Sequence, residues 1–222
     1  MDKQTAKLIA RIAENLPRDL DDQVMQGWID NPVSLQRFLS GLCPETSEPM
    51  EKFALFADLG IITVPDDYDH ATALTSFRKK NYEKFYYYND NIADHNFPKP
   101  TRVLKPGDKL RVCAFKQVVG GSTTSEERMD FLRSQKAVFT GAQGASLVFD
   151  QKRDQLPKGR WYTSFDEKER LWQDAGGYHG VPRVDADSGG DFYFCLGLFG
   201  SAWCAYFALL CFCDLEFESS GA

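Results

Sequence analysis

The chain has 222 residues, of which 43% are apolar and 26% charged, so it is long enough and apolar enough to bury a sizeable core. Its net charge is -6, and six acidic residues follow Arg183 without a single basic one. This distribution argues against binding of a nucleic-acid backbone as the main activity, because such binding depends on clustered Lys and Arg.

Apolar residues at helical spacing predict helices in the first sixty residues. Asn31 followed by Pro32 is typical of a helix start, and Gly60 is typical of a helix end. The predicted helices cover residues 9–16, 20–28, 35–42 and 53–59. A less regular helical stripe follows at 74–88, and the prolines of segment 96–100 mark a connector. We therefore expect a helical N-terminal region, 1–96, and a second domain, 101–222.

Beyond the connector the hydrophobic pattern changes to period two. Residues 110–119 alternate after the turn at Pro106-Gly107-Asp108, and Thr124 with Glu127 makes a capping box that opens a helix to Ser134. Gly141 to Ser146 lacks the lysine of a phosphate loop and predicts a hairpin turn. Further strands are predicted at 101–104, 137–140, 146–149 and 160–165. The expected fold is α+β, with an N-terminal helical layer followed by a mostly antiparallel β sandwich or open barrel.

The stretch from Phe192 to Cys213 has twenty-two residues without a charge, which is enough for a helix to span a bilayer as a tail anchor. Against a membrane span, both flanks are acidic and glycines interrupt the run near its middle. Period two also continues through the C-terminal end of the run. We predict two adjacent strands over 192–213 and keep the tail-anchored membrane protein as an alternative.

The richest supply of aromatic and polar side chains lies between residues 161 and 187. Such a set is typical of a ligand pocket, and we expect one of the two tryptophans to border the most concave surface. The candidate binding residues are Trp161, Tyr162, Trp172, His179, Asp185 and Asp187. The structural alternative is core aromatics with loop carboxylates. The enzymatic alternative is a hydrolase that uses His179 with Asp185 or Asp187.

Two other patterns resemble known chemical sites. Asp187-Ser188-Gly189-Gly190 resembles the nucleophile loop of chymotrypsin-like serine proteases, but Ala186 and Asp191 replace the glycine and proline that flank it there. A polar turn accounts for this string. Four cysteines within 195–213 lack the spacing of zinc knuckles and have no basic neighbours, which favours neutral thiols. We predict no catalytic residue, no metal and no cofactor.

The run from Leu156 to Tyr162 and the Pro106-Gly107-Asp108 turn make the chain similar to uncharacterised proteins of uncultured bacteria. The resemblance implies a bacterial cytoplasmic protein and no particular function. The first thirty residues agree with this compartment, because acidic residues interrupt any signal-peptide core. The expected activity is that of a binding or interaction module, with a protein or small molecule as its partner.

Overall fold

The computed structural model describes residues 51–215 and, ahead of them, five isolated helical positions: Lys3, Ala6, Gln26, Gly27 and Asp30. The chain divides into two compact units, Met1–Met50 and Glu51–Ala222. The predicted helices at 9–16, 20–28 and 35–42 therefore fall almost entirely outside the described residues. The connector at 96–100 lies inside the second unit, so the residues on both sides of it share one core.

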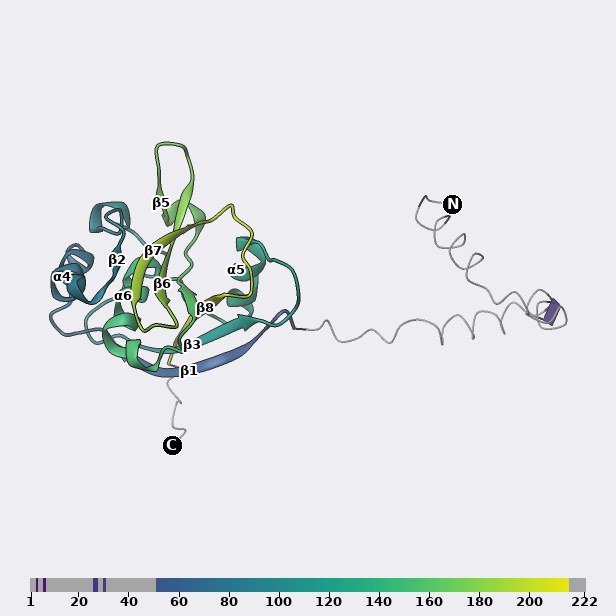
Figure 1. Cartoon of the computed structure of the whole chain (residues 1–222), viewed down its shortest axis with the longest axis horizontal. Coiled ribbons are helices and arrows are strands. Elements are labelled where there is room, and N and C mark those ends of the chain that lie inside the picture. The colour runs from purple at the N-terminus through teal and green to yellow at the C-terminus, as the bar shows by residue number, and fades with distance from the viewer. Residues whose placement is uncertain (1–2, 4–5, 7–25, 28–29, 31–50, 216–222) are drawn as a thin grey trace, which may run out of the picture. The chain divides into compact units, whose positions relative to one another are not determined.

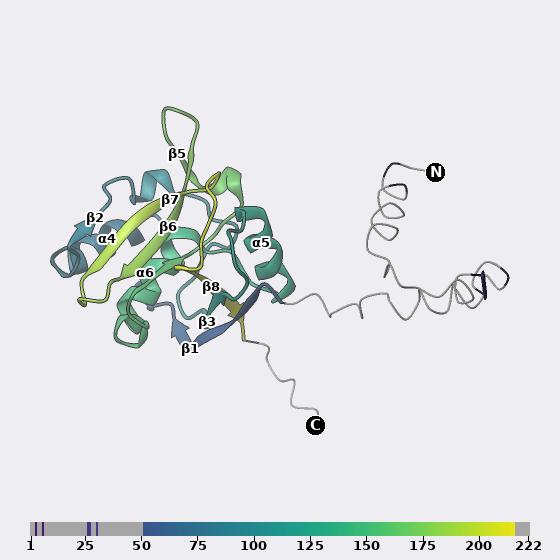
Figure 2. The same ribbon diagram turned by 45° about the vertical axis from the view of Figure 1, so that its right-hand side comes forward.

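The described part of the second unit is a mixed sheet with helices on its two faces (Figures 1 and 2). The strands occur in the order β1-β3-β8-β4-β6-β7-β2, and β5 pairs with β6. Neighbouring strands are antiparallel except for β4 with β8 and β2 with β7. The α+β, β-rich class predicted from the sequence is thus confirmed, and all eight strands belong to one sheet. The elements are β1 (Phe53–Thr63), α4 (Ala73–Asn81), β2 (Tyr87–Tyr88), β3 (Lys109–Gln117), α5 (Ser125–Ser134), α6 (Gly141–Lys152), β4 (Arg160–Thr163), β5 (Trp172–Gln173), β6 (His179–Ala186), β7 (Phe192–Leu198) and β8 (Phe207–Asp214).

The helix predicted for residues 53–59 is wrong, because these residues begin the edge strand β1. Two irregularities in its pairing with β3, at Leu55/Ala57 and Asp58/Gly60, insert extra residues. Because each bulge adds a residue to the strand, the buried residues of β1 are spaced more like those of a helix than at every second position. Gly60, which suggested a helix end, has a φ of +71° and donates its N–H to the Asp58 side chain at 2.9 Å. The expected N-terminal helical layer therefore has no support from this segment.

Helices α4 and α6 cover one face of the sheet. Phe77 of α4 and Phe149 of α6 pack edge-on against each other, with ring centroids 5.8 Å apart, and Phe77 reaches Phe194 of β7. Helix α5 covers the other face at the β1 and β3 end, where Phe131 packs on Phe53 and Phe115. The sheet is thus covered by different helices on its two faces.

The hairpin turn predicted at 141–146 and the strand predicted at 146–149 are both wrong, because this segment forms α6. The first nine residues of α6 are all buried, so the helix has no polar face that would reveal its period in the sequence. Gly144 allows close packing: a Cβ there would lie 2.9 Å from Phe212 of β8 and closer still to Thr140. The glycines therefore serve helix-to-sheet contact rather than a turn.

Residues 192–213 form strands β7 and β8, as the interrupted pattern predicts. Their predicted adjacency is wrong, because β4 and β6 lie between them in the sheet. The apolar run is therefore two separate strands rather than one continuous helix. Within the described residues, no helix has the length and apolar character needed to cross a membrane.

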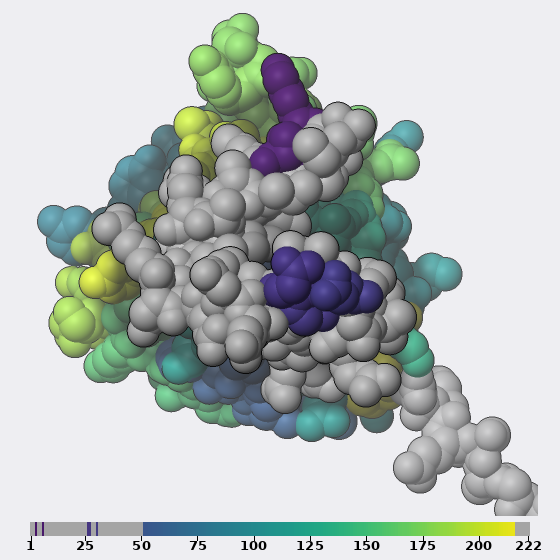
Figure 3. Space-filling model, turned by 90° about the vertical axis from the view of Figure 1, so that its right-hand side faces the viewer, coloured from purple at the N-terminus to yellow at the C-terminus, as the bar shows by residue number. Residues whose placement is uncertain are grey.

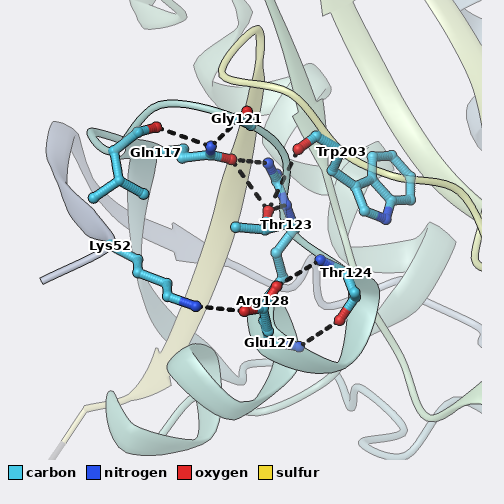
Figure 4. A network of polar contacts seen from close by, with 9 residues as sticks. Lys52, Gln117, Gly121, Thr123, Thr124, Glu127, Arg128 and Trp203 are labelled. Carbon is cyan, nitrogen blue, oxygen red and sulfur yellow. Dashed lines mark hydrogen bonds and ion pairs between the residues drawn. The ribbon is translucent and has the colours of Figure 1, made fainter. Parts of the chain in front are cut away.

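A buried arginine, Arg128, links the connection between β7 and β8 to helix α5. Figure 4 shows its contacts with Thr123 and Gln117. The capping box predicted at Thr124 and Glu127 is confirmed and places Arg128 in the first turns of α5. The Arg128 guanidinium donates to the Thr123 hydroxyl, the Gln117 side chain and the backbone oxygens of Cys204 and Phe207, at 2.8–3.2 Å. Among the described residues these acceptors are all neutral oxygens. The network thereby fixes where β8 begins.

Candidate functional site

Strand register gathers the polar residues of the central strands on the face that α4 and α6 do not cover. Trp161 of β4 lies directly opposite Asp185 of β6, and Arg183 of β6 lies opposite Cys195 of β7. Directly paired residues of antiparallel strands share a face, and so do residues two apart in one strand. These four residues, with Phe207 of β8 opposite Trp161, form what we call the Arg183–Asp185 site.

The central ion pair of this site is incomplete. Arg183 Nη2 lies 3.4 Å from Asp185 Oδ2, and the two side chains are 19% and 6% exposed. Asp185 Oδ1 and Arg183 Nε are both buried and have no hydrogen-bond partner. Buried polar atoms are nearly always hydrogen-bonded, so an unpaired donor and an unpaired acceptor in one pair require an explanation.

Burial controls the protonation of the site. It raises the pKa of Asp185 to about 7, and the charge of Arg183 offsets only part of this effect. Burial and the Asp185 carboxylate together raise the pKa of the Cys195 thiol to about 11. At neutral pH the site therefore holds a carboxyl group that is partly protonated and a thiol that stays protonated.

Aromatic rings surround the guanidinium of Arg183. Its central carbon lies 4.7 Å from the centre of the Trp161 ring and 5.4 Å from that of Phe207. Trp161 packs edge-on against Phe207 with a centroid distance of 4.7 Å. Trp161 is nevertheless 37% exposed, the largest exposed fraction in the site. Such a cation between rings is held in place without a full salt bridge.

Two of the predicted site residues lie on the opposite face. Tyr162 follows Trp161 in the strand and therefore points the other way, where it is fully buried and its hydroxyl donates to Pro157 O. Trp172 of β5 packs over Gly180, 3.1 Å from the position that a Cβ would take there. Neither side chain contributes to the Arg183–Asp185 site.

The remaining two predicted residues lie outside the site, His179 because of its distance and Asp187 because its carboxylate is engaged in a turn. His179 starts β6, six residues before Asp185, which places them roughly 20 Å apart in an extended strand. Asp187 lies in the turn after β6, where its carboxylate accepts the N–H groups of Gly190 and Asp191 at 2.7 and 2.8 Å. Ser188 belongs to this polar turn. The geometry thus does not bring His179 within hydrogen-bonding reach of either carboxylate.

A surface pocket of about 200 Å³ lies elsewhere, between α4, α6 and the segment 65–72. Neither Trp161 nor Trp172 lines this pocket. Lys80 and Asp150 in its wall pair with each other at 2.7 Å, and Asp69 accepts hydrogen bonds from residues of its own turn. Because these charges are already satisfied, the pocket gives a weaker indication of a ligand.

The hairpin that joins β5 and β6 projects from the sheet (Figures 1 and 3). Its tip carries Tyr178, which is 61% exposed. Within residues 51–215, no three His, Cys, Asp or Glu side chains converge in a way that could hold a metal ion.

Arg183 and Cys195 were missed in the sequence. Period-two spacing would have placed Arg183 on the same face as Asp185, since the two are separated by one residue. Pro182 obscures this pattern, because proline is uncommon inside a central strand. Cys195 is brought to the site only by the pairing of β6 with β7, which has no local signal.

Comparison of the chain with models of known protein families, with curated proteins and with solved structures found no match.

Proposed function

We propose that the second unit is a binding module whose ligand occupies the Arg183–Asp185 site. The observation that carries this proposal is the unpaired donor and unpaired acceptor of the Arg183 and Asp185 side chains. A buried carboxyl group with a raised pKa lowers folding stability whenever it is ionised. Perturbed and incompletely satisfied groups of this kind concentrate at functional sites.

The two unpaired atoms specify the chemistry of the ligand. Arg183 Nε carries a hydrogen that requires an acceptor, and ionised Asp185 Oδ1 requires a donor. A planar amide-like edge, as in a carboxamide or a nucleobase, presents an acceptor and a donor side by side. The exposed face of Trp161 offers an aromatic surface for the rest of such a molecule. The proposed ligand is therefore a small planar molecule with an amide-like edge.

Access to the two atoms requires a side chain to turn aside, because both are buried. Trp161 is the most exposed side chain of the site, and its indole also contacts Phe207. Rotation of this ring would change its contacts with both Arg183 and Phe207. Tryptophan fluorescence therefore reports binding directly.

The test is a titration of the full chain with nicotinamide, cytosine and adenine, followed by tryptophan fluorescence and by thermal unfolding. A ligand that binds only the folded state raises the Tm, by an amount set by its concentration relative to Kd. Benzoate, which has a ring and acceptors but no donor, serves as the control compound. We expect at least one of the three amide-type compounds to bind and benzoate not to.

Two variants link binding to the site. Trp161→Ala and Asp185→Asn should each weaken binding about tenfold or more. The first removes the stacking surface, and the second removes the charge and replaces one carboxylate oxygen by an NH2 group that cannot accept. Tyr178→Ala is the matched control, since it removes an exposed aromatic ring from the projecting hairpin. Equal binding by all three variants, or no binding by any amide-type compound, would contradict the proposal.

A further inference from the structure

A cluster of three thiols lies at the other end of the same sheet face. Cys113 of β3 is the direct register partner of Cys211 in β8, and Cys213 follows two residues later on the same face. The sulfur atoms of Cys211 and Cys213 are 3.7 Å apart. Residues two apart in a strand have Cα atoms separated by about 6.6 Å, which lies within the ~4.4–6.8 Å range of disulfides.

The three thiols differ in access to solvent. Cys211 is 2% exposed, whereas Cys113 and Cys213 are half-buried. Cys213 is the register partner of Arg111, whose side chain is 60% exposed and pairs with Asp58 at 2.6 Å. A small reagent can therefore reach Cys213 at the edge of the cluster, while Cys211 lies behind it.

The surroundings activate Cys213 in particular. The hydrogen-bonding contact between the two sulfur atoms lowers the pKa of Cys213, and the positive charge of Arg111 adds to this effect, whereas burial opposes it. The thiolate is the reactive form of cysteine, and positive neighbours favour it. In contrast, burial raises the pKa of Cys195, the half-buried thiol of the Arg183–Asp185 site.

We propose that Cys213 and Cys211 are a peroxide-reactive dithiol that closes to an intramolecular disulfide. The Cys213 thiolate attacks one oxygen of hydrogen peroxide, the O–O bond breaks, and the second oxygen leaves as water after taking up a proton. The Cys211 sulfur then attacks the sulfenic acid on Cys213, the S–O bond breaks, and a second water leaves. The two thiols are oxidised by two electrons, and one peroxide is reduced to two waters.

The experiment treats the full chain with hydrogen peroxide, blocks the remaining thiols with an alkylating reagent and maps the cysteines by mass spectrometry. Trypsin leaves the last four cysteines on one peptide, because no Lys or Arg follows Arg183. Chymotrypsin cleaves after Phe207 and so separates Cys211 and Cys213 from the two preceding cysteines. We expect a disulfide between Cys211 and Cys213 that a reducing agent reverses.

Single variants identify the role of each sulfur. In Cys211→Ser, oxidation should stop at a sulfenic acid on Cys213 that dimedone traps; in Cys213→Ser, oxidation of Cys211 should slow about tenfold or more. Cys204→Ser, which removes an exposed thiol outside the cluster, is the matched control and should behave as the wild type. Circular dichroism before treatment verifies that each variant is folded.

Three outcomes would overturn the proposal. The first is retention of both thiols at a peroxide concentration that oxidises exposed Cys204. The second is a disulfide that joins Cys113 or Cys195 instead of the Cys211–Cys213 pair. The third is unchanged oxidation of Cys211 in the folded Cys213→Ser variant.

Discussion

Replacement of Asp185 by asparagine should change how stability depends on pH. Relative to the wild type, the variant should be more stable at neutral and alkaline pH than at acidic pH. The carboxyl group is 5% exposed, and burial raises its pKa from 3.8 to about 7. In the unfolded chain the group loses its proton near pH 4, but in the folded protein it keeps the proton until about pH 7. The folded state therefore binds more protons between these values, and stability falls as the pH rises through this window.

The size of the effect follows from the shift in pKa. A rise from 3.8 to about 7 corresponds to about 4 kcal/mol at full ionisation. Asparagine has nearly the same shape as aspartate and cannot ionise. The Asp185→Asn variant should therefore not lose stability as the pH rises through this window. Relative to the wild type, the free energy of unfolding of the variant should increase by about 2 to 4 kcal/mol between pH 4 and pH 8.

The assay is urea unfolding followed by far-ultraviolet circular dichroism at pH 4, 6 and 8. Asp154→Asn is the matched control, because its side chain is 88% exposed and its replacement should show no comparable pH dependence. A difference between Asp185→Asn and wild type that stays constant within about 0.5 kcal/mol across this range would refute the reasoning. A confirmed gain would mean that Asp185 is retained at the expense of stability, as expected for a binding residue.

Gly144→Ala should destabilise the protein by about 1 to 3 kcal/mol in urea unfolding, because its Cβ would overlap Thr140 and Phe212. Gly120→Ala, which meets no atom within 4 Å, should change stability by less than about 1 kcal/mol, and an equal loss would contradict the packing argument. Arg128→Met should cost about 3 kcal/mol or more, since it leaves buried oxygens without donors. In the same helix, Arg133→Met removes two ion pairs of a 45% exposed side chain, and it should cost less than about 1 kcal/mol.

Some elements could be predicted from the sequence because their signals are local. The capping box of α5 consists of two side chains three residues apart, and its hydrogen bonds form within one turn. Strand β3 shows its alternation because one face is buried and the other is half-exposed. Residues 192–213 were recognised as two strands because Gly197 and Gly200 interrupt an otherwise continuous apolar run.

Other elements were decided only by tertiary packing. The bulges of β1 depend on its pairing with β3 and removed the period-two pattern from its own sequence. The first nine residues of helix α6 are all buried, so this part of its sequence carries no amphipathic pattern.

The candidate site likewise has some residues that the sequence indicated and others that only the structure revealed. The sequence identified Trp161 and Asp185 from the local density of aromatic and acidic residues, and the structure places them opposite each other. The sequence could not exclude Tyr162 or His179 from the site. Strand register determines on which face of the sheet a side chain lies and how far it is from Asp185. Arg183 became part of the site through its place on the same face of β6, and Cys195 through the pairing of β6 with β7. Register is set by contacts between residues distant in sequence, so only the folded sheet determines which side chains meet.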